Sequence, residues 1–330
     1  MKYLITGCNG LVGSHTARLI LKNGGSVRAI KRPNSDLSML QDIKDQIEWH
    51  EADVLDILGL DRAVEGVDYV IHAAAMISFS PKQKTMMHKV NVEGTANVVN
   101  ACIRHEVKKL CYISSVGAIG RPLKKHHLDE TQKWEESPLN SQYGLTKYLG
   151  EQEVFRGIAE GLDAVIVNPS IILGTGDWSK SSTQLFKYVW DKKRFYPRGA
   201  FNYVDVRDVA DAVFKLIHSP KNGERFILCA GNVKYTDFFS QVAHTFNRVI
   251  SYRVVKAWMG EVAWRWEKLK SWLTGREPLI TKETVRSSAA SITFNGTKVT
   301  QEIDFQYRKL EDSIAWICRY FEEKSLNSSY

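Results

Sequence analysis

A tyrosine and a lysine four positions apart, Tyr143 and Lys147, are the residues whose types and spacing most clearly indicate chemistry. On a helix, positions four apart lie on one face, so the lysine ammonium can lie beside the tyrosine phenol. The pKa of an unperturbed tyrosine is about 10, and a neighbouring positive charge stabilises the phenolate and lowers that pKa. The pair therefore predicts a side chain that can give or take a proton.

A hydroxyl group that can hold a substrate oxygen is expected at Ser115, which follows Ser114 at the end of a buried strand candidate. Ligands of parallel sheets bind at the carboxyl ends of the strands, so this serine is expected at the same edge as the glycine turn described next. Ser115 would then hold the substrate oxygen while Tyr143 moves its proton. From the residues alone, an ordinary turn position for Ser115 remains the alternative.

The beginning of the chain predicts an anion-binding turn. Lys2–Thr6 is a strand candidate, and glycines at positions 7, 10 and 13 lead from it into a helix candidate, Ser14–Asn23. Glycine lets the backbone approach a ligand closely and adopt positive φ, and the N–H groups at a helix start favour a pyrophosphate. The spacing is G-x-x-G-x-x-G, so an ordinary strand-to-helix turn is the alternative to dinucleotide binding.

Charged and small residues after the next strands indicate how a dinucleotide would continue from this turn. Lys31 and Arg32 lie where an NAD site carries an acidic residue for the ribose hydroxyls, so a ribose 2′-phosphate, and hence NADP, is favoured over NAD. Two surface cations are the alternative. Asp53 can accept a hydrogen bond from the adenine amino group or cap the next turn. The alanines at 73–75 allow a cofactor to approach the backbone.

The first half of the chain alternates strand and helix, which predicts an α/β fold with a Rossmann-type, doubly wound parallel sheet covered on both faces. The expected strands are Lys2–Thr6, Ser26–Ile30, Ile47–His50, Tyr69–Ala73, Leu110–Ser114 and Ala164–Asn168, and the expected helices are Ser14–Asn23, Ser38–Gln46, Leu58–Val64, Val92–His105 and Tyr143–Glu160.

After Asn168-Pro169 this alternation ends, which predicts a smaller C-terminal lobe for the substrate. Arg225–Cys229 is expected to be a strand that returns to the sheet, and Tyr235–Phe246 is expected to be a helix. We assign residues 1–168 and 201–232 to the dinucleotide-binding domain. Residues 169–200 and 233–330 are assigned to the substrate-binding lobe.

Composition indicates a globular protein with a normal core: 44% of the 330 residues are hydrophobic and 25% are charged. No apolar run reaches the roughly 18 residues of a membrane span, and the first residues do not form a signal peptide, so we expect a cytoplasmic protein. The net charge of +8 comes from dispersed basic residues, which argues against nucleic-acid binding. The five cysteines lack metal-ligand spacing, so free thiols and no metal are expected.

The tryptophan-rich segment Ala257–Leu273 is predicted to be a helix with an apolar stripe. Packing within the second lobe is the favoured interpretation of that stripe. Trp264 falls on the opposite face beside basic residues, so contact with a membrane surface or a role as a substrate lid is the alternative.

Together these motifs resemble the extended short-chain dehydrogenase/reductase family, also described as the NAD-dependent epimerase/dehydratase family. The similar segments follow in order over the first half of the chain, and Tyr203–Ala210 extends the match into the second half. They are Thr6-Gly7-x-x-Gly10-x-x-Gly13, Asp53-Val54, His72-Ala73-Ala74, Asn91-Val92-Glu93-Gly94-Thr95, Ser114-Ser115, Tyr143-x-x-x-Lys147 and Asn168-Pro169-Ser170.

The resemblance implies hydride transfer at a nicotinamide, with Ser115, Tyr143 and Lys147 as the catalytic trio and Lys147 also on the nicotinamide ribose. It further implies a homodimer formed through Val92–His105 and Tyr143–Glu160. The cofactor-binding residues expected from the residue pattern and the resemblance together are Thr6, Gly7, Asn9, Gly10, Leu11, Val12, Gly13, Lys31, Arg32, Asp53, Val54, Ala73, Ala74, Ala75, Asn91, Tyr143, Lys147, Asn168, Pro169 and Ser170.

Two segments distinguish branches of that family. Val116-Gly117 stand where sugar-nucleotide 4,6-dehydratases carry Asp-Glu, and Asn168-Pro169-Ser170 is not followed by the Tyr-Gly-Pro of the epimerases. The chain looks more like dihydroflavonol reductases and 3β-hydroxysteroid dehydrogenases, which implies reduction of a ketone, or its reverse, on a fairly apolar small molecule. A sugar-nucleotide epimerase that uses NAD is the alternative. A non-catalytic, cofactor-sensing regulator is a further one, although such proteins usually lack the Tyr-Lys pair.

Overall fold

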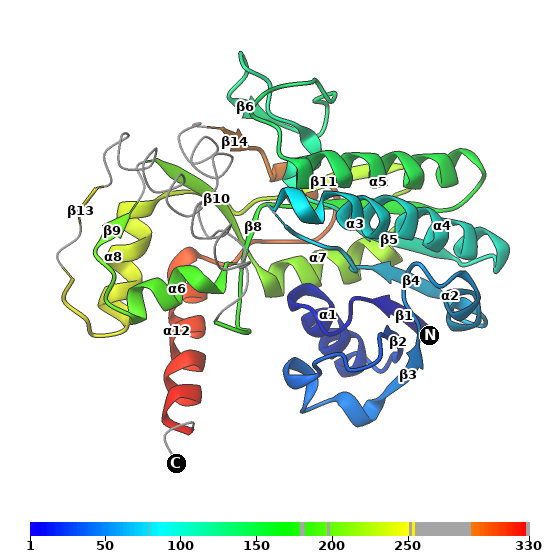
Figure 1. The fold of residues 1–330 in the computed structure, drawn as a ribbon, viewed down its shortest axis with the longest axis horizontal. Helices are drawn as coiled ribbons and strands as arrows, with labels where there is room; N and C mark the ends of the chain where they lie inside the picture. The colour runs from blue at the N-terminus through cyan, green and yellow to red at the C-terminus, as the bar shows by residue number, and fades with distance from the viewer. Residues whose placement is uncertain (79, 179–181, 197–198, 251–252, 255–291, 328–330) are drawn as a thin grey trace.

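Seven parallel strands form the central sheet of the molecule (Figure 1). The computed structural model describes residues 1–78, 80–178, 182–196, 199–250, 253–254 and 292–327. In spatial order the strands are β11 (Glu224–Leu228), β7 (Ala164–Pro169), β5 (Lys109–Ile113), β4 (Tyr69–His72), β1 (Lys2–Thr6), β2 (Ser26–Lys31) and β3 (Ile47–Glu51). The chain runs outward from β1 in both directions, so a ligand-binding switch point is formed beside β1.

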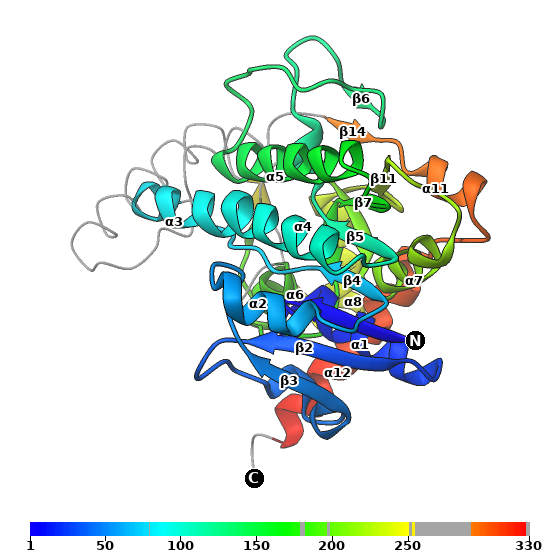
Figure 2. The ribbon, with the colours of Figure 1, turned by 90° about the vertical axis from the view of Figure 1, so that its right-hand side faces the viewer.

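Helices cover both faces of this sheet, as Figure 2 shows. Successive residues of a strand point to opposite faces, so Ile5 of β1 belongs to one core and Leu4 to the other. The Ile5 face is covered by α1 (Leu11–Lys22) and α7 (Val206–His218). The Leu4 face is covered by α2 (Ile57–Val64), α4 (Gly94–Arg104) and α5 (Gln142–Ala159). A short helix, α3 (Lys84–His88), and a π-helical turn over Lys89–Glu93 lead into α4.

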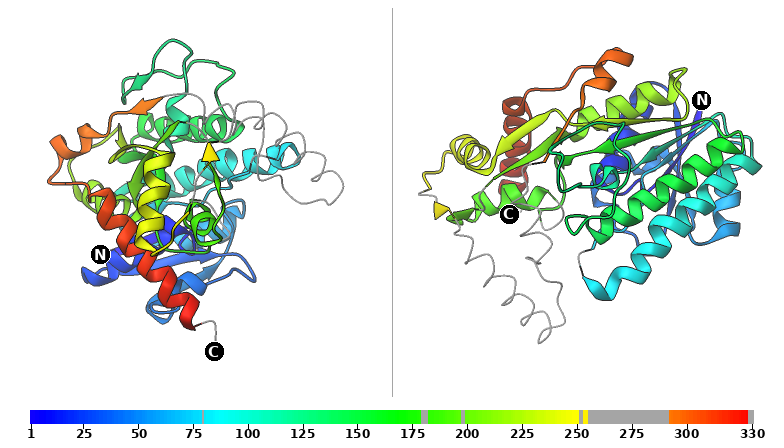
Figure 3. Two further views of the ribbon diagram at one scale, coloured as in Figure 1. Left: turned by 90° about the vertical axis from the view of Figure 1, so that its left-hand side faces the viewer. Right: turned by 90° about the horizontal axis from the view of Figure 1, so that it is seen from above.

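A second, smaller group of elements lies beyond the carboxyl end of the sheet (Figure 3). It contains a three-stranded sheet of β8 (Ile171–Leu173), β10 (Ala200–Asp205) and β12 (Gly231–Lys234). The helices α6 (Thr183–Trp190), α8 (Tyr235–Thr245) and α12 (Leu310–Asn327) surround an aromatic core of Phe186, Phe238 and Phe321. The ring centroids of Phe186 and Phe238 are 5.4 Å apart in an edge-to-face arrangement.

Two short strand pairs and one helix make up the remaining strands and α-helices described. β6 (His127–Leu128) pairs with β14 (Thr293–Phe294), β9 (Phe195–Tyr196) pairs with β13 (Arg253–Val254), and α11 (Thr297–Glu302) packs against β11. None of the helices in the described ranges combines the length and the apolar character that crossing a membrane requires. The predicted helix Ala257–Leu273, and with it the question of membrane contact, lies outside the described residues.

The predicted strands of the first half are confirmed to within one residue at either end, and β11 confirms the strand expected at Arg225–Cys229. The predicted helix Ser38–Gln46 is wrong: two separate 3₁₀ turns, Ser38–Leu40 and Lys44–Gln46, occupy this stretch. Leu37, Leu40 and Ile43 recur every third residue and face the same core. The amides of Leu40 and Ile43 donate to the carbonyls three residues earlier at 2.8 and 2.9 Å, because the period of three suits a 3₁₀ turn better than an α-helix.

Candidate active site

The glycine turn between β1 and α1 is packed closely against the end of β4. Gly7 has a φ of +69°, and a Cβ atom there would lie 2.7 Å from the Ala74 nitrogen. A Cβ atom on Gly13 would lie 2.3 Å from the Gly7 oxygen, so both positions require glycine. Gly10 caps α1 without any side-chain hydrogen bond, and this leaves N–H groups of the first helical turn available to an anion.

Other residues expected at the pyrophosphate surround this turn. Leu11 and Val12 are half-buried in the first turn of α1, and Ala75 is exposed after β4. Asn9 donates its Nδ2 to the Asp36 carbonyl at 3.2 Å, so it ties the turn to the loop after β2. The turn is thus held by the end of β4 and by the loop after β2.

The cations expected at the ribose phosphate lie at the end of β2, next to carboxylates at and just after the end of β3. The Lys31 Nζ is 4.0 Å from a Glu51 carboxylate oxygen, and the Arg32 Nε is 3.8 Å from the Asp53 Oδ2. The Arg32 side chain is 74% exposed, so it can turn toward a ligand. Asp53 Oδ1 accepts a hydrogen bond from the amide two residues later at 3.0 Å, which is the turn-capping interaction, and Val54 is buried beside it.

Ser115 and Tyr143 are brought together by two glycines. Ser115 begins the 3₁₀ turn Val116–Ile119 after β5, and its Oγ accepts a hydrogen bond from the Gly117 amide at 3.1 Å. A Cβ atom on Gly144 would lie 2.7 Å from the Gly117 oxygen, so this turn and the start of α5 are in backbone contact. In this arrangement Ser115 lies near enough to Tyr143 to favour the deprotonated form of its phenol.

Lys147 lies one helical turn further along α5 and is 1% exposed. Its Nζ donates to the Ile113 carbonyl at 2.7 Å and lies 4.2 Å above the ring centroid of Tyr112. Burial lowers the pKa of Lys147 to about 7, and the negative charge of Glu151 opposes that shift. The ammonium therefore sits at the end of β5, next to the serine and the tyrosine.

The expectation that Lys147 lowers the pKa of Tyr143 differs from what is observed. Burial raises the pKa of Tyr143 to about 12, and the neighbouring Ser115 offsets only part of that effect. Burial is the larger cause, and the Lys147 Nζ is bonded to the Ile113 carbonyl. Tyr143 is consequently a protonated phenol at neutral pH, which suits a proton donor.

A row of buried polar groups connects the glycine turn to this region. The register of the sheet places Thr6 level with His72, and the Ala74 amide donates to the Thr6 Oγ1 at 3.2 Å. The Thr6 hydroxyl then donates to the His72 Nδ1 at 2.6 Å, so the His72 Nε2–H donates to the Thr95 Oγ1 at 3.0 Å. The Thr95 hydroxyl in turn donates to the Asn91 carbonyl at 2.7 Å. Burial, followed by the charge of Lys147, lowers the pKa of His72 to about 3.

Asn91, expected among the cofactor-binding residues, lies in the interior at 1% exposure. Its side-chain amide bonds to both backbone groups of Met76, at 2.7 Å from the nitrogen and 2.9 Å from the oxygen. It also donates to the Thr146 Oγ1 at 3.0 Å, and Thr146 donates to the Tyr143 carbonyl. Asn91 therefore holds the segment after β4 against α5.

The end of β7 supplies Asn168, Pro169 and Ser170, all of them buried. Asn168 donates its Nδ2 to the Ser115 carbonyl at 3.0 Å and to a Glu151 carboxylate oxygen at 2.5 Å. Its Oδ1 is a buried acceptor that has no donor among the described residues. Buried polar atoms are normally paired, so this acceptor fits a site that receives a polar ligand.

Reasoning from the sequence missed several buried residues behind the trio. Glu151 and Arg225 form a buried ion pair behind Lys147, and His72 and Thr95 complete the polar row from the glycine turn. For Glu151 a signal was present, since Tyr143, Lys147 and Glu151 follow one another at intervals of four on one helix. For Arg225 the sequence held no signal, because its partner lies 74 residues earlier in the chain.

The predicted residues thus gather at one sheet edge but at separate points along it. The trio lies at β5 and the cations at β2, which the strand order separates by three spacings, or about 14 Å. The glycine turn lies between them at β1. This arrangement fits an extended dinucleotide with its pyrophosphate at the uncapped start of α1, its nicotinamide at the trio and its adenosine at the cations.

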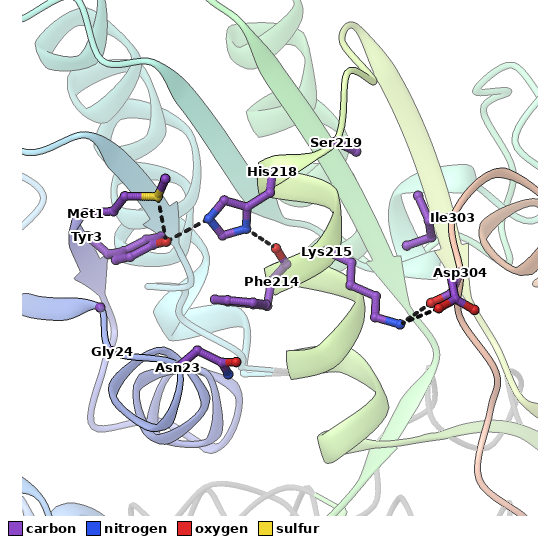
Figure 4. Close-up of a pocket in the computed structure, with 11 residues that line it drawn as sticks. Met1, Tyr3, Asn23, Gly24, Phe214, Lys215, His218, Ser219, Ile303 and Asp304 are labelled. Atoms are coloured by element: carbon purple, nitrogen blue, oxygen red, sulfur yellow. Dashed lines mark hydrogen bonds and ion pairs between the residues drawn. The ribbon is translucent and has the colours of Figure 1, made fainter.

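A surface cavity of about 570 Å³ lies at the opposite, amino-terminal edge of the sheet, between the ends of α1 and α7 (Figure 4). The Tyr3 hydroxyl and the His218 Nε2 are 2.7 Å apart, and the His218 Nδ1 donates to the Phe214 carbonyl at 2.6 Å. Lys215 pairs with Asp304 at 3.9 Å. These polar side chains are engaged with one another, so we assign the cavity no part in the chemistry.

Comparison with known proteins gives one matching family model and several relatives. A model of the NAD dependent epimerase/dehydratase family matches residues 3–229. A putative dihydroflavonol 4-reductase from Synechocystis sp. (strain ATCC 27184 / PCC 6803 / Kazusa) is 28% identical over 327 residues, which cover 97% of this chain and 94% of that protein. Cinnamoyl-CoA reductase 1 from Petunia hybrida is 30% identical over 245 residues, which cover 69% of this chain and 72% of that protein.

Solved structures show the same fold. The crystal structure of gox2253 has a TM-score of 0.83 and 31% sequence identity, and the match covers 98% of both chains. The Bordetella bronchiseptica enzyme WbmH, solved in complex with NAD⁺, has a TM-score of 0.75 and 20% identity, with 98% of both chains covered. At that lower identity the likeness concerns the fold alone.

Proposed function

The chain belongs to the NAD-dependent epimerase/dehydratase family and is an NAD(P)-dependent oxidoreductase, and from this premise we propose that it reduces a ketone, or oxidises the corresponding secondary alcohol, on a fairly apolar small molecule. The observation that carries the proposal is the close approach of the turn that holds Ser115 to the start of α5, which brings Ser115 next to Tyr143, one helical turn from the buried Lys147. The pair lies at the same sheet edge as the uncapped glycine turn.

In the proposed reaction the hydroxyl groups of Ser115 and Tyr143 hold the substrate carbonyl oxygen. The nicotinamide, when bound, supplies the hydride for the carbonyl carbon. Tyr143 donates its proton to the carbonyl oxygen, and its raised pKa of about 12 means that this proton is present at neutral pH. Lys147 would hold the ribose hydroxyls and stabilise the tyrosinate left after proton transfer.

NADP is the cofactor we favour, since Lys31 and Arg32 supply two cations at the end of β2 for a ribose phosphate. The named reductases among the relatives support a reductive reaction on an organic substrate with an aromatic or alicyclic body. We assign the binding of that body to residues 169–200 and 233–330. The homodimer expected through Val92–His105 and Tyr143–Glu160 stays a prediction, for which light scattering in solution is the test.

Replacement of Tyr143 by phenylalanine tests the proposal. A panel of aromatic and alicyclic ketones is first screened with NADPH to find a substrate that the unmodified protein reduces. Tyr143→Phe should then lower kcat at least about a hundredfold, because the proton donor is lost. The affinity for NADPH, measured by fluorescence titration, should change less than about twofold, since the ring remains in place.

The matched control is Tyr148→Phe, a tyrosine on the same helix that stacks on Trp134 with ring centroids 4.6 Å apart. Its kcat should stay close to that of the unmodified protein. Undiminished turnover by Tyr143→Phe would contradict the assigned role, as would an equal loss in both variants.

A further inference from the structure

Glu151 is a carboxylate sealed inside the protein one helical turn after Lys147. The side chain is 0% exposed, and its Oε1 accepts hydrogen bonds from the Ser114 Oγ and the Asn168 Nδ2, both at 2.5 Å. Ser114 lies between Ile113, whose carbonyl binds the Lys147 ammonium, and the catalytic Ser115. The carboxylate therefore joins the catalytic helix to the end of β5.

Arg225 of β11 engages the other carboxylate oxygen. Its Nη1 is 3.4 Å from the Glu151 Oε2, and its Nη2 donates to the carbonyls of Glu130 and Gln132 at 2.7 and 3.0 Å. A buried carboxylate is costly unless it is paired and hydrogen-bonded, and here both oxygens have donors. Burial raises the pKa of Glu151 above its usual value, and the hydrogen bond from Ser114, the charge of Arg225 and the hydrogen bond from Asn168 each offset part of that rise by stabilising the carboxylate.

Within the part of the chain that the structure describes, Glu151 is the group of opposite charge that acts on Lys147. From α5 the ammonium is affected by the charge of Glu151, from β5 it contacts the Tyr112 ring and the Ile113 carbonyl, and on β4 it acts on the neutral His72. Arg225 on β11 reaches the cluster only through Glu151. Among the described residues that face Lys147, Glu151 is therefore the anion that favours the protonated lysine.

We propose that Glu151 is a positioning residue for the proposed hydride transfer, one whose buried carboxylate keeps the Lys147 ammonium charged and holds the end of β5 against the catalytic helix. The inference rests on the proposed role of Lys147. Glu151 touches neither the substrate nor the reacting atoms, so it acts through Lys147, Ser114 and Asn168.

The direction in which the pKa of Lys147 changes follows from its neighbours. Glu151 is an anion that interacts with both Lys147 and Arg225. Removal of the Glu151 charge makes it easier for Lys147 to lose its proton, so the lysine becomes neutral at a lower pH. The alkaline limb of kcat/KM for ketone reduction should then move to lower pH. A purely structural glutamate would lower activity or stability without moving this limb.

Glu151→Gln tests the proposal, because glutamine keeps the shape and an acceptor for Ser114 but removes the charge. We expect the alkaline limb of kcat/KM with NADPH to shift to a pH lower by about one unit or more. The reason is that the variant loses an opposite charge one helical turn from Lys147 in a buried site. Glu153→Gln is the control on the same helix, where Glu153 pairs with Arg156 at the surface, and its profile should match that of the unmodified protein.

A second measurement follows the protonation of Lys147 directly and needs no substrate. The side-chain ε resonance of Lys147, assigned by its loss in Lys147→Arg, is titrated by NMR in the unmodified protein and in both glutamate variants. The midpoint should fall in Glu151→Gln and stay unchanged in Glu153→Gln. Ser114→Ala changes no charge and should also lower the midpoint, because Glu151 then takes up a proton more readily; this variant serves if Glu151→Gln does not fold.

The two measurements separate the inference from the proposed function. A lowered NMR midpoint in a protein that reduces no ketone contradicts the proposed function and supports the control of Lys147 by Glu151. An unchanged midpoint in both Glu151→Gln and Ser114→Ala, or a pH limb that stays in place in Glu151→Gln, overturns the inference.

Discussion

At Tyr143, the proposed proton donor, burial and the neighbouring Ser115 act in opposite directions on the pKa of the phenol. The residue types suggested an activated phenolate, whereas burial raises the pKa of Tyr143 to about 12 and keeps the proton on the oxygen. A phenol that holds its proton suits the reductive direction, in which the carbonyl oxygen must be protonated. Lys147 matters more for the tyrosinate formed afterwards, and this explains why its charge is maintained by Glu151.

The spacing of Tyr143 and Lys147 could be interpreted from the sequence because a helix fixes which side chains share a face. The direction in which the lysine points could not, because it depends on the Ile113 carbonyl, 34 residues away in the chain. The same holds for the pair of Glu151 and Arg225, which forms only when β11 joins β7 at the edge of the sheet. Local pattern thus predicted the trio, and tertiary contact determined its electrostatics.

Arg32 is the residue through which the cofactor preference can be tested. Arg32→Glu replaces a cation by an anion at the proposed 2′-phosphate, so the affinity for NADPH should fall by about tenfold to a hundredfold. The affinity for NADH, which lacks that phosphate, should change little. Isothermal titration with both nucleotides at one ionic strength gives the comparison.

The control for this charge reversal is Lys22→Glu, an exposed lysine at the far end of α1. It makes the same change in net charge away from the carboxyl edge of the sheet, so both affinities should be retained. Equal binding of NADPH before and after Arg32→Glu would show that these cations are ordinary surface residues.

The turn between β1 and α1 assigns different duties to its glycines. A Cβ atom on Gly13 would collide with the Gly7 carbonyl at 2.3 Å, whereas a Cβ atom on Gly10 meets only that same oxygen at 3.2 Å. Gly13 is thus required by the fold of the turn itself. At Gly10 a side chain would fit the fold but would occupy the open space beside the turn. A pyrophosphate at the start of α1 would occupy that space.

Alanine substitutions should separate these duties. Gly13→Ala should destabilise the protein by about 1–3 kcal/mol, because the backbone must shift to relieve the collision. Gly10→Ala should leave the midpoint of thermal unfolding nearly unchanged and weaken NADPH binding. Thermal unfolding and nucleotide titration of both variants give the two readouts, and a stability loss in Gly10→Ala as large as that in Gly13→Ala would contradict the division.

The elements themselves were predicted best where the hydrophobic pattern was long and regular. The strands of the first half alternate with amphipathic helices, so their order predicted the parallel sheet. The stretch over Ser38–Gln46 was misjudged because its apolar residues recur every third position, and an α-helix pattern tolerates such a spacing. Short pieces such as β8 and β12 lack an internal pattern, and pairing with β10 determines them.

At the scale of the whole molecule, the two faces of the sheet bury different polar groups. On the α1 face, His15 stands edge-on to the Trp316 ring of the C-terminal helix, at 5.7 Å between centroids. On the α4 face, His72 is fully buried in the polar row. Burial is the largest cause in both cases, and it lowers the pKa of His15 to about 4 and that of His72 to about 3.

These histidines should make folding stability depend on pH. Both remain neutral in the folded chain, whereas the unfolded chain binds a proton on each below its ordinary pKa of about 6.5. The folded-state pKa values are lowered, so the stability is lost as the pH falls from about 6.5 toward 4 for His15 and toward 3 for His72. Each histidine should remove about 2 kcal/mol from the free energy of unfolding between pH 7 and pH 5.

Urea unfolding at pH 7 and pH 5 measures this loss, and the window excludes carboxylates such as Glu48, whose pKa is lowered to about 2 by Lys2 and its other partners. His15→Gln removes one of the two titrating groups, so its stability should fall by about 2 kcal/mol less than that of the unmodified protein over the same range. His126→Gln, at an exposed loop position, is the control and should retain the full loss.

If His15→Gln lost as much stability as the unmodified protein, His15 would have to take up its proton in the folded state. The contact between α1 and the C-terminal helix would then be open to water.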